Sequence, residues 1–191
     1  MSVTTEPIRS KEDLRRLASY YYNRGELRNY TLVILGYNTA LRISDLLSLR
    51  WDDVYDFESR CFRIHVTVSE KKTKKKKTFR LNKSALKALK IFFKHRTSPY
   101  IFSNGRKHDL PINRVTAWRI ITKAVAALHI PGKIACHSLR KTWGYQAWKS
   151  GRVPLAIITQ IYNHSSYEVT KRYLGITQDD LDDAYMAVDL S

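Results

Sequence analysis

Apolar side chains recur at helical spacing in the first fifty residues. Ser10 and Asp13 have the spacing of a capping pair, and leucine, alanine and tyrosine side chains then fall on one face of a predicted helix. A second, strongly apolar helix is predicted at about residues 27–38, and Ser44 caps a short leucine-rich helix after it. Arg42 therefore lies at the junction of two apolar helices. An isolated arginine at such a junction often extends along the core to reach solvent.

The middle of the chain changes to a period of two residues. Residues 61–68 alternate with β-branched side chains, residues 78–81 have the pattern of a returning strand, and residues 51–56 are predicted to form a strand that leads into a turn. Six lysines fall within residues 69–77, at the tip of the predicted hairpin. Most lysine runs are solvated loops, but a cationic finger on a small sheet also suits contacts with phosphates.

Helical spacing returns after the hairpin. The predicted helices cover about residues 82–95, 112–128, 137–148, 154–161, 165–173 and 177–188, and residues 103–109 form a turn-rich connection. Ser165 and Glu168 have the spacing of a capping box, and Thr177 caps the last helix. The pattern is typical of a mainly helical α+β domain with a small sheet.

Composition narrows the choice of partner. The 191 residues, 43% of them hydrophobic, are enough for one domain with one core. Lysine and arginine number 34 against 17 acidic residues, a net charge of +17, and 16 of the 34 lie between residues 60 and 107. So concentrated a positive charge favours nucleic acid as the partner over a membrane surface. The chain has neither an apolar run of about 18 residues nor the order of a signal peptide, so we expect a cytoplasmic protein with no membrane partner.

The sequence offers little support for a cofactor or a metal. Cys61 and Cys136 have neither a CxxC partner nor metal-ligand spacing, and we expect two buried thiols. None of the seven glycines belongs to a nucleotide-binding motif. The predictions are therefore no cofactor and no metal.

Six side chains have the chemistry to cleave a phosphodiester if the fold brings them together. Arg42 and Arg140 would grip nonbridging oxygens and stabilise a pentacoordinate phosphorus. Tyr173, one of 12 tyrosines, would be the nucleophile, and His137 would accept its proton. His164 would donate a hydrogen bond to the phosphate. A hairpin lysine would protonate the leaving 5′ oxygen, and the product would be a 3′-phosphotyrosine bond.

Three ordered segments carry a resemblance to a known family. Residues 39–54, with the sequence TALRISDLLSLRWDDV, closely resemble the first signature box of the tyrosine recombinase (phage integrase) family. Residues 137–142, HSLRKT, resemble its HxxR box, and residues 164–173 resemble its final box with the usual histidine-to-tyrosine spacing. The resemblance covers most of the chain. It implies a mainly helical catalytic domain with a small three-stranded antiparallel sheet, which cleaves and rejoins double-stranded DNA without a metal.

The resemblance also assigns the catalytic residues. Arg42, His137, Arg140, His164 and Tyr173 match the family pattern one to one, and Asp45 matches a structural acidic position. The family places a lysine on the hairpin turn, and among the six lysines here the prediction is Lys72, with Lys71 and Lys74 as alternatives. Before His164, the chain has Tyr-Asn where the family commonly has Leu-Gly.

The expected organisation is a single catalytic domain over residues 1–191. Its core spans about residues 10–175, and the helix within residues 176–191 would dock on a neighbouring subunit of a homotetramer on DNA, weakly associated when free. Many family members have an N-terminal core-binding domain that this chain lacks. The chain is then either a catalytic-domain fragment or a short member like the fimbrial-switch recombinases, and the Met1 start and capped first helix favour the short form.

The predicted function is integration, excision or inversion of DNA by a site-specific recombinase. One alternative is a type IB topoisomerase, which uses the same tyrosine chemistry to relax DNA. The other is a non-catalytic DNA-binding regulator with the same fold. The regulator should lack an arginine or the tyrosine, and both are present in the matching segments.

Overall fold

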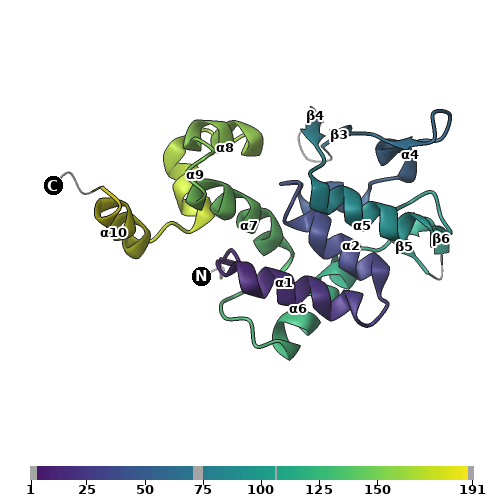
Figure 1. The fold of residues 1–191 in the computed structure, drawn as a ribbon, viewed down its shortest axis with the longest axis horizontal. Helices are drawn as coiled ribbons and strands as arrows, with labels where there is room; N and C mark the ends of the chain where they lie inside the picture. The colour runs from purple at the N-terminus through teal and green to yellow at the C-terminus, as the bar shows by residue number, and fades with distance from the viewer. Residues whose placement is uncertain (1–3, 71–74, 106, 189–191) are drawn as a thin grey trace.

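Helices make up most of the fold, which a computed structural model describes over residues 4–70, 75–105 and 107–188 (Figure 1). The helices are α1 (Lys11–Tyr22), α2 (Leu27–Gly36), α3 (Ile43–Leu47), α4 (Trp51–Val54), α5 (Lys83–Phe93), α6 (Arg114–Ala127), α7 (Cys136–Lys149), α8 (Leu155–Tyr162), α9 (Tyr167–Leu174) and α10 (Gln178–Met186). The strands are β1 (Tyr55–Asp56), β2 (Cys61–Phe62), β3 (His65–Ser69), β4 (Lys76–Arg80), β5 (Ser103–Asn104) and β6 (Lys107–Pro111). The predicted mainly helical α+β class is confirmed.

The larger hydrophobic cluster lies among α1, α2, α5 and α6, and α1, α2 and α5 lie side by side in Figure 1. Leu17 and Tyr21, one helical turn apart on α1, are buried against this cluster. Helix α2 is apolar almost all round because it runs through the middle of the cluster. A Cβ atom at Gly36 would collide with Leu139 of α7. The glycine thus allows α2 and α7 to approach closely.

Helices α7, α8 and α9 form a second, smaller cluster at the other end of the molecule (Figure 1). Its buried members are Ala40, Ile158, Tyr162 and Leu174. Gly144 of α7 faces Tyr162 and Leu174, and any side chain there would collide with both. Since α7 also contributes Leu139 to the larger cluster, this helix joins the two halves of the core.

The strands form three separate antiparallel pairs in the described residues, β1–β2, β3–β4 and β5–β6, rather than the expected three-stranded sheet. The predicted strand over residues 61–68 is divided because its chain changes partners. The amide of Arg63 donates to Val54 O, whereas Ile64 O accepts from the amide of Leu81. The break lies at residues 63–64, between the β1–β2 and β3–β4 pairs.

Three other local predictions were wrong. Residues 51–54 form helix α4 instead of a strand, because Asp53 accepts from the Arg50 amide at 2.7 Å and Trp51 and Val54 bury the same face. Residues 103–109, expected as a turn-rich connection, belong to the β5–β6 hairpin, which extends to Pro111. Cys61 is exposed rather than buried, since it lies in a two-residue strand, and Cys136 is half-buried.

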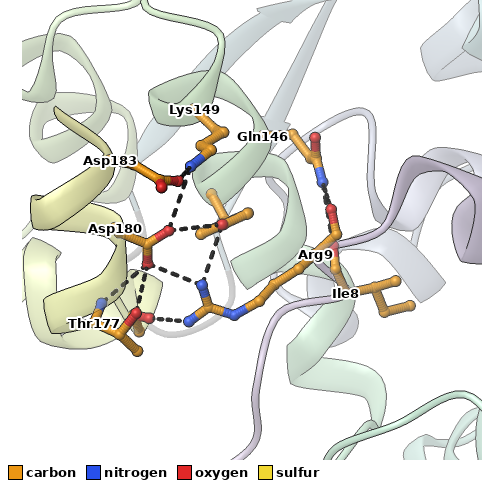
Figure 2. A network of polar contacts seen from close by, with 9 residues as sticks. Ile8, Arg9, Gln146, Lys149, Thr177, Asp180 and Asp183 are labelled. Carbon is orange, nitrogen blue, oxygen red and sulfur yellow. Dashed lines mark hydrogen bonds and ion pairs between the residues drawn. The ribbon is translucent and has the colours of Figure 1, made fainter. Parts of the chain in front are cut away.

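The N-terminal segment and α10 are joined by a polar network (Figure 2). The Arg9 guanidinium donates to Asp180 at 2.9 Å and to Tyr145 Oη at 3.1 Å. Tyr145 Oη in turn donates to Asp180 at 3.0 Å, and Lys149 pairs with Asp183 at 2.7 Å. Helix α10 is therefore held against α7 of its own chain.

Candidate active site

Tyr173 lies on α9 with its ring turned toward the interior. Ser166 caps the start of this helix, one residue after the predicted cap, and Gly175 ends it with a φ of 68°. The Tyr173 hydroxyl oxygen is buried and has no hydrogen-bond partner among the described residues. Burial raises its pKa, while the positive charges of Arg140 and Arg42 oppose that rise. The arginines therefore favour the phenolate that burial disfavours.

Two histidines contact the Tyr173 ring edge-to-face. His137 comes from the first turn of α7, and its ring centroid lies 5.1 Å from that of Tyr173. His164 comes from the turn between α8 and α9, at 4.9 Å. The side chains that the sequence places far apart are thus brought into contact around one phenol ring.

The turn that carries His164 depends on a left-handed residue. Asn163 ends α8 with a φ of 55°, a conformation that asparagine adopts more readily than most residues other than glycine. The Tyr-Asn pair, which stands where the family commonly has Leu-Gly, therefore still forms the turn. Thr170 then fixes the imidazole, because its hydroxyl lies 3.1 Å from His164 Nδ1 and 2.9 Å from Thr159 Oγ1.

Arg140 is buried beside this cluster, with 3% of its surface exposed. Its guanidinium donates to Ala40 O and, at 3.4 Å, to Tyr162 O. It also stacks on the Tyr162 ring at 4.5 Å, and the Tyr162 hydroxyl donates to Arg140 O at 2.6 Å. Both of these hydrogen bonds go to backbone carbonyls, which neutralise less of a guanidinium's charge than a carboxylate would, so much of the charge remains available to an anion.

Arg42 occupies the position just before α3, with extended backbone. Its Nη1 atom lies 2.6 Å from Glu70 Oε1, and only 7% of the Glu70 side chain is exposed. The charge of Arg42 also lowers the pKa values of His137 and His164. Arg42 is therefore close to the cluster but paired with a carboxylate.

Both histidines are held in the neutral form near pH 7. Burial, with the charges of Arg140 and other cations behind it, lowers the pKa of His137 to about 4. Burial and Arg140 also lower the pKa of His164. A neutral imidazole beside a phenol can accept its proton, which is the role predicted for His137.

The lysines divide into a described and an undescribed group. Lys72, the predicted proton donor, and its alternatives Lys71 and Lys74 lie outside the described residues. Lys77, which the sequence did not single out, donates to Ile161 O at 3.1 Å and reaches Ala40 O at 3.4 Å. Nothing in a run of lysines distinguishes this one, because only its place on β4 turns it inward.

Other groups at the site were also missed. Lys141 donates to Thr5 O at 2.7 Å and lies 5.2 Å from the centre of the Tyr173 ring; its adjacency to Arg140 was the one available signal. Ala40 has a φ of 55°, and nothing in the sequence indicates that this alanine adopts a left-handed conformation. Asp45, predicted to be structural, is 1% exposed.

Two hollows flank the cluster. One of about 660 Å³ has His137 in its lining, together with Ile43, Arg114 and Trp118. Another of about 400 Å³ lies between the β3–β4 hairpin and α8 and includes Lys77 and Asn163. In the part of the chain that is described, no group of three or more histidine, cysteine or acidic residues could hold a metal ion. No helix within the same residues is long and apolar enough to cross a membrane.

Comparison with known proteins identifies the family. The phage integrase family model matches residues 9–179. YoeC of Bacillus subtilis (strain 168), a probable integrase/recombinase, is 36% identical over 181 residues, 94% of this chain and 94% of YoeC. Tyrosine recombinase XerA of Pyrococcus furiosus is 28% identical over 92% of this chain, which spans 59% of XerA.

Solved structures give the same fold. The crystal structure of XerA recombinase superposes with a TM-score of 0.77, at 22% identity, over 98% of this chain and 65% of that one. XerH bound to the palindromic difH substrate, in a post-cleavage complex, gives a TM-score of 0.73 at 16% identity over 96% of this chain and 53% of that one. The chain therefore belongs to the phage integrase family of site-specific tyrosine recombinases.

Proposed function

We propose that this protein cleaves and rejoins double-stranded DNA at specific sites through a 3′-phosphotyrosine bond on Tyr173. The observation that carries the proposal is the contact of the Tyr173 ring with both His137 and His164, at 5.1 Å and 4.9 Å. Arg140 and Arg42 add positive charge around a buried hydroxyl that makes no hydrogen bond to the described residues. This is the environment that phosphoryl transfer to a phenol requires.

The arginines bind and stabilise the phosphate in this proposal. Arg140 is fixed by backbone carbonyls and by stacking on Tyr162, so its guanidinium is already oriented when DNA binds. Arg42 reaches the nonbridging oxygens after leaving Glu70. Both stabilise the charge of the pentacoordinate phosphorus without a metal ion.

Proton transfers complete the step. The Tyr173 oxygen attacks phosphorus and gives its proton to His137, which is neutral because burial lowers its pKa. The bond from phosphorus to the 5′ oxygen breaks, and that oxygen takes a proton from a hairpin lysine, for which Lys72 stays the prediction. His164 donates a hydrogen bond to the phosphate. Attack of a 5′ hydroxyl on the phosphotyrosine reverses these transfers and rejoins the strand.

DNA is the proposed substrate and partner, and the cytoplasm is the proposed location. The net charge of +17 and the hollow lined partly by Arg114 and His137 support a polyanion approaching this face. The post-cleavage XerH complex shows a protein of the same fold bound to its DNA substrate.

Four copies are proposed to act together, weakly associated before DNA binds. Exchange of strands between two duplexes requires four cleavages, hence four tyrosines. A contact between subunits is supported by apolar side chains that are exposed on α10 and just after it: Leu181, Tyr185, Met186 and Val188. We also propose that residues 10–175 form the core of one catalytic domain.

The test uses nicked suicide duplexes with randomised sites, on which the covalent adduct cannot be resealed. The wild-type protein should form an adduct that withstands denaturation, even with a chelator present, and Tyr173→Phe should form none. Tyr167→Phe, which changes an exposed tyrosine of the same helix, is the matched control and should behave as wild type. An adduct that survives Tyr173→Phe would refute the assignment. Relaxation of supercoiled DNA without joined partners would instead support a topoisomerase.

A further inference from the structure

Lys77 is placed differently from the other described lysines of the hairpin. Lys75 and Lys76 are exposed, whereas Lys77 is turned toward α8 and half-buried. Its ammonium lies 3.1 Å from Ile161 O in the last turn of α8 and 3.4 Å from Ala40 O, just before α3. One side chain of β4 therefore bridges two elements that are distant in sequence.

Arg140 shares one of these acceptors and uses the neighbour of the other. It donates to Ala40 O and to Tyr162 O, the carbonyl that follows Ile161 at the end of α8. Carbonyls at a helix C-terminus have no partner within the helix and carry partial negative charge. Lys77 and Arg140 thus clamp the end of α8 to the Ala40 turn from two sides, one from the hairpin and one from α7.

The surroundings of Lys77 are mixed in charge. Burial and the nearby Arg140 lower its pKa to about 8; Arg42 acts in the same direction, while Glu70 and Asp45 oppose it. At pH 7 the Lys77 side chain is therefore mostly charged, and it becomes mostly neutral as the pH rises above about 8. Once neutral, the side chain loses the charge that favours its contacts with the carbonyls.

We propose that Lys77 is a positioning residue of the cleavage site, which ties the β3–β4 hairpin to α8 and the Ala40 turn and so orients Arg140. The inference rests on the proposed function of Tyr173. It assigns to Lys77 a role distinct from that of the proton donor, because its ammonium is engaged by backbone carbonyls.

The first test is the rate of adduct formation on the suicide duplex. Lys77→Met should slow it on the order of 10- to 100-fold, since small misplacements of catalytic groups have effects of this size. Lys77→Arg, which keeps the charge, should recover most of the rate. Arg80→Met removes an exposed cation of the same strand, outside the lysine run, and should leave the rate near wild type. Equal rates for Lys77→Met and Arg80→Met would overturn the proposal.

Leaving-group chemistry separates positioning from proton donation. A duplex with sulfur in place of the bridging 5′ oxygen has a leaving group that needs no proton. Lys77→Met should stay slow on this substrate, whereas a variant lacking the proton donor should recover. Recovery of Lys77→Met would make Lys77 the acid itself and reject the positioning role. If the wild-type protein formed no adduct on either duplex, the Tyr173 assignment would fail instead.

Two further readouts exclude a merely structural effect. Wild-type cleavage should decline as pH rises through about 8, and Lys77→Arg should keep its rate to higher pH. Without DNA, amides of β4 should exchange hydrogen faster in Lys77→Met than in Arg80→Met, with both variants folded by circular dichroism. An alkaline decline that persists in Lys77→Arg, or unchanged exchange in Lys77→Met, would contradict the proposal.

Discussion

At the scale of single residues, the Arg42–Glu70 pair is the contact that DNA must change. The 2.6 Å ion pair occupies an arginine proposed to bind phosphate, and the Glu70 carboxylate is nearly buried. A carboxylate offers oxygen atoms to a guanidinium much as a phosphate does. Phosphate binding therefore competes with an internal partner.

Glu70→Gln should strengthen binding of a phosphate-bearing duplex by about tenfold, because loss of one charge-assisted contact, about 1.4 kcal/mol, corresponds to that factor. Binding is measured by fluorescence anisotropy with Tyr173→Phe in the background, so that no adduct forms. Glu58→Gln removes the same charge at an exposed position and should change affinity far less. Weaker binding by Glu70→Gln would mean that Glu70 orients Arg42 for DNA instead of competing with it.

The identities of Arg42, His137, Arg140, His164 and Tyr173 could be predicted from sequence because their order and spacing follow a known family. Their geometric partners could not. The carbonyl of Ala40 and the hydroxyl of Thr170 become acceptors only when distant elements pack together. A sequence alone does not show which backbone carbonyl or which hydroxyl will accept a hydrogen bond from a site residue.

At the scale of elements, helices with good caps were predicted within a few residues. Ser10 and Asn82 begin α1 and α5, because each offers an oxygen to a free amide of the first turn. Thr177 begins α10 differently, since its amide and its hydroxyl both donate to the Asp180 carboxylate, at 3.0 and 3.1 Å. Residues 51–56 were predicted less well. A short helix over 51–54 and a strand share the same apolar pattern there, and only the Arg50–Asp53 hydrogen bond decides between them.

Helix α10 depends on the Asp180 carboxylate, which is 5% exposed. Burial alone would raise its pKa, but hydrogen bonds from Thr177, Arg9 and Tyr145 lower it below the ordinary value. The folded-state pKa is the lower of the two, so the carboxylate stabilises docking above its unfolded pKa, near 4, and this stabilisation is lost as pH falls from there through the folded-state pKa. Docking of α10 should therefore be intact at neutral pH and weaken in acid.

Asp180→Asn should lose roughly 1–3 kcal/mol of docking free energy at pH 7, the usual effect of losing charged hydrogen bonds. Hydrogen exchange of the α10 amides measures it. The variant should exchange quickly at every pH, whereas the wild type should lose protection only below about pH 4. Asp179→Asn, at an exposed neighbouring position, should match the wild type. Unchanged protection in Asp180→Asn would show that α10 is held by other contacts.

At the scale of the whole molecule, the site lies where the two hydrophobic clusters meet. Helix α7 carries His137 and Arg140 and packs on both clusters, while α9 brings Tyr173 from the smaller one. The β3–β4 hairpin reaches the same place through Glu70 and Lys77. A phosphate bound here would lie among groups from α7, α9, the residue before α3 and the β3–β4 hairpin.

The measurement that tests the central claim most directly is the identity of the residue linked to DNA. The adduct on the suicide duplex is digested with nuclease and trypsin, and the peptides are sequenced by mass spectrometry. The tryptic peptide after Arg172 contains two tyrosines, Tyr173 and Tyr185, so fragmentation distinguishes the buried residue from the exposed one. A nucleotide joined through a 3′ phosphate to Tyr173 is the expected result. A nucleotide on Tyr185, or on any other residue, would contradict the account.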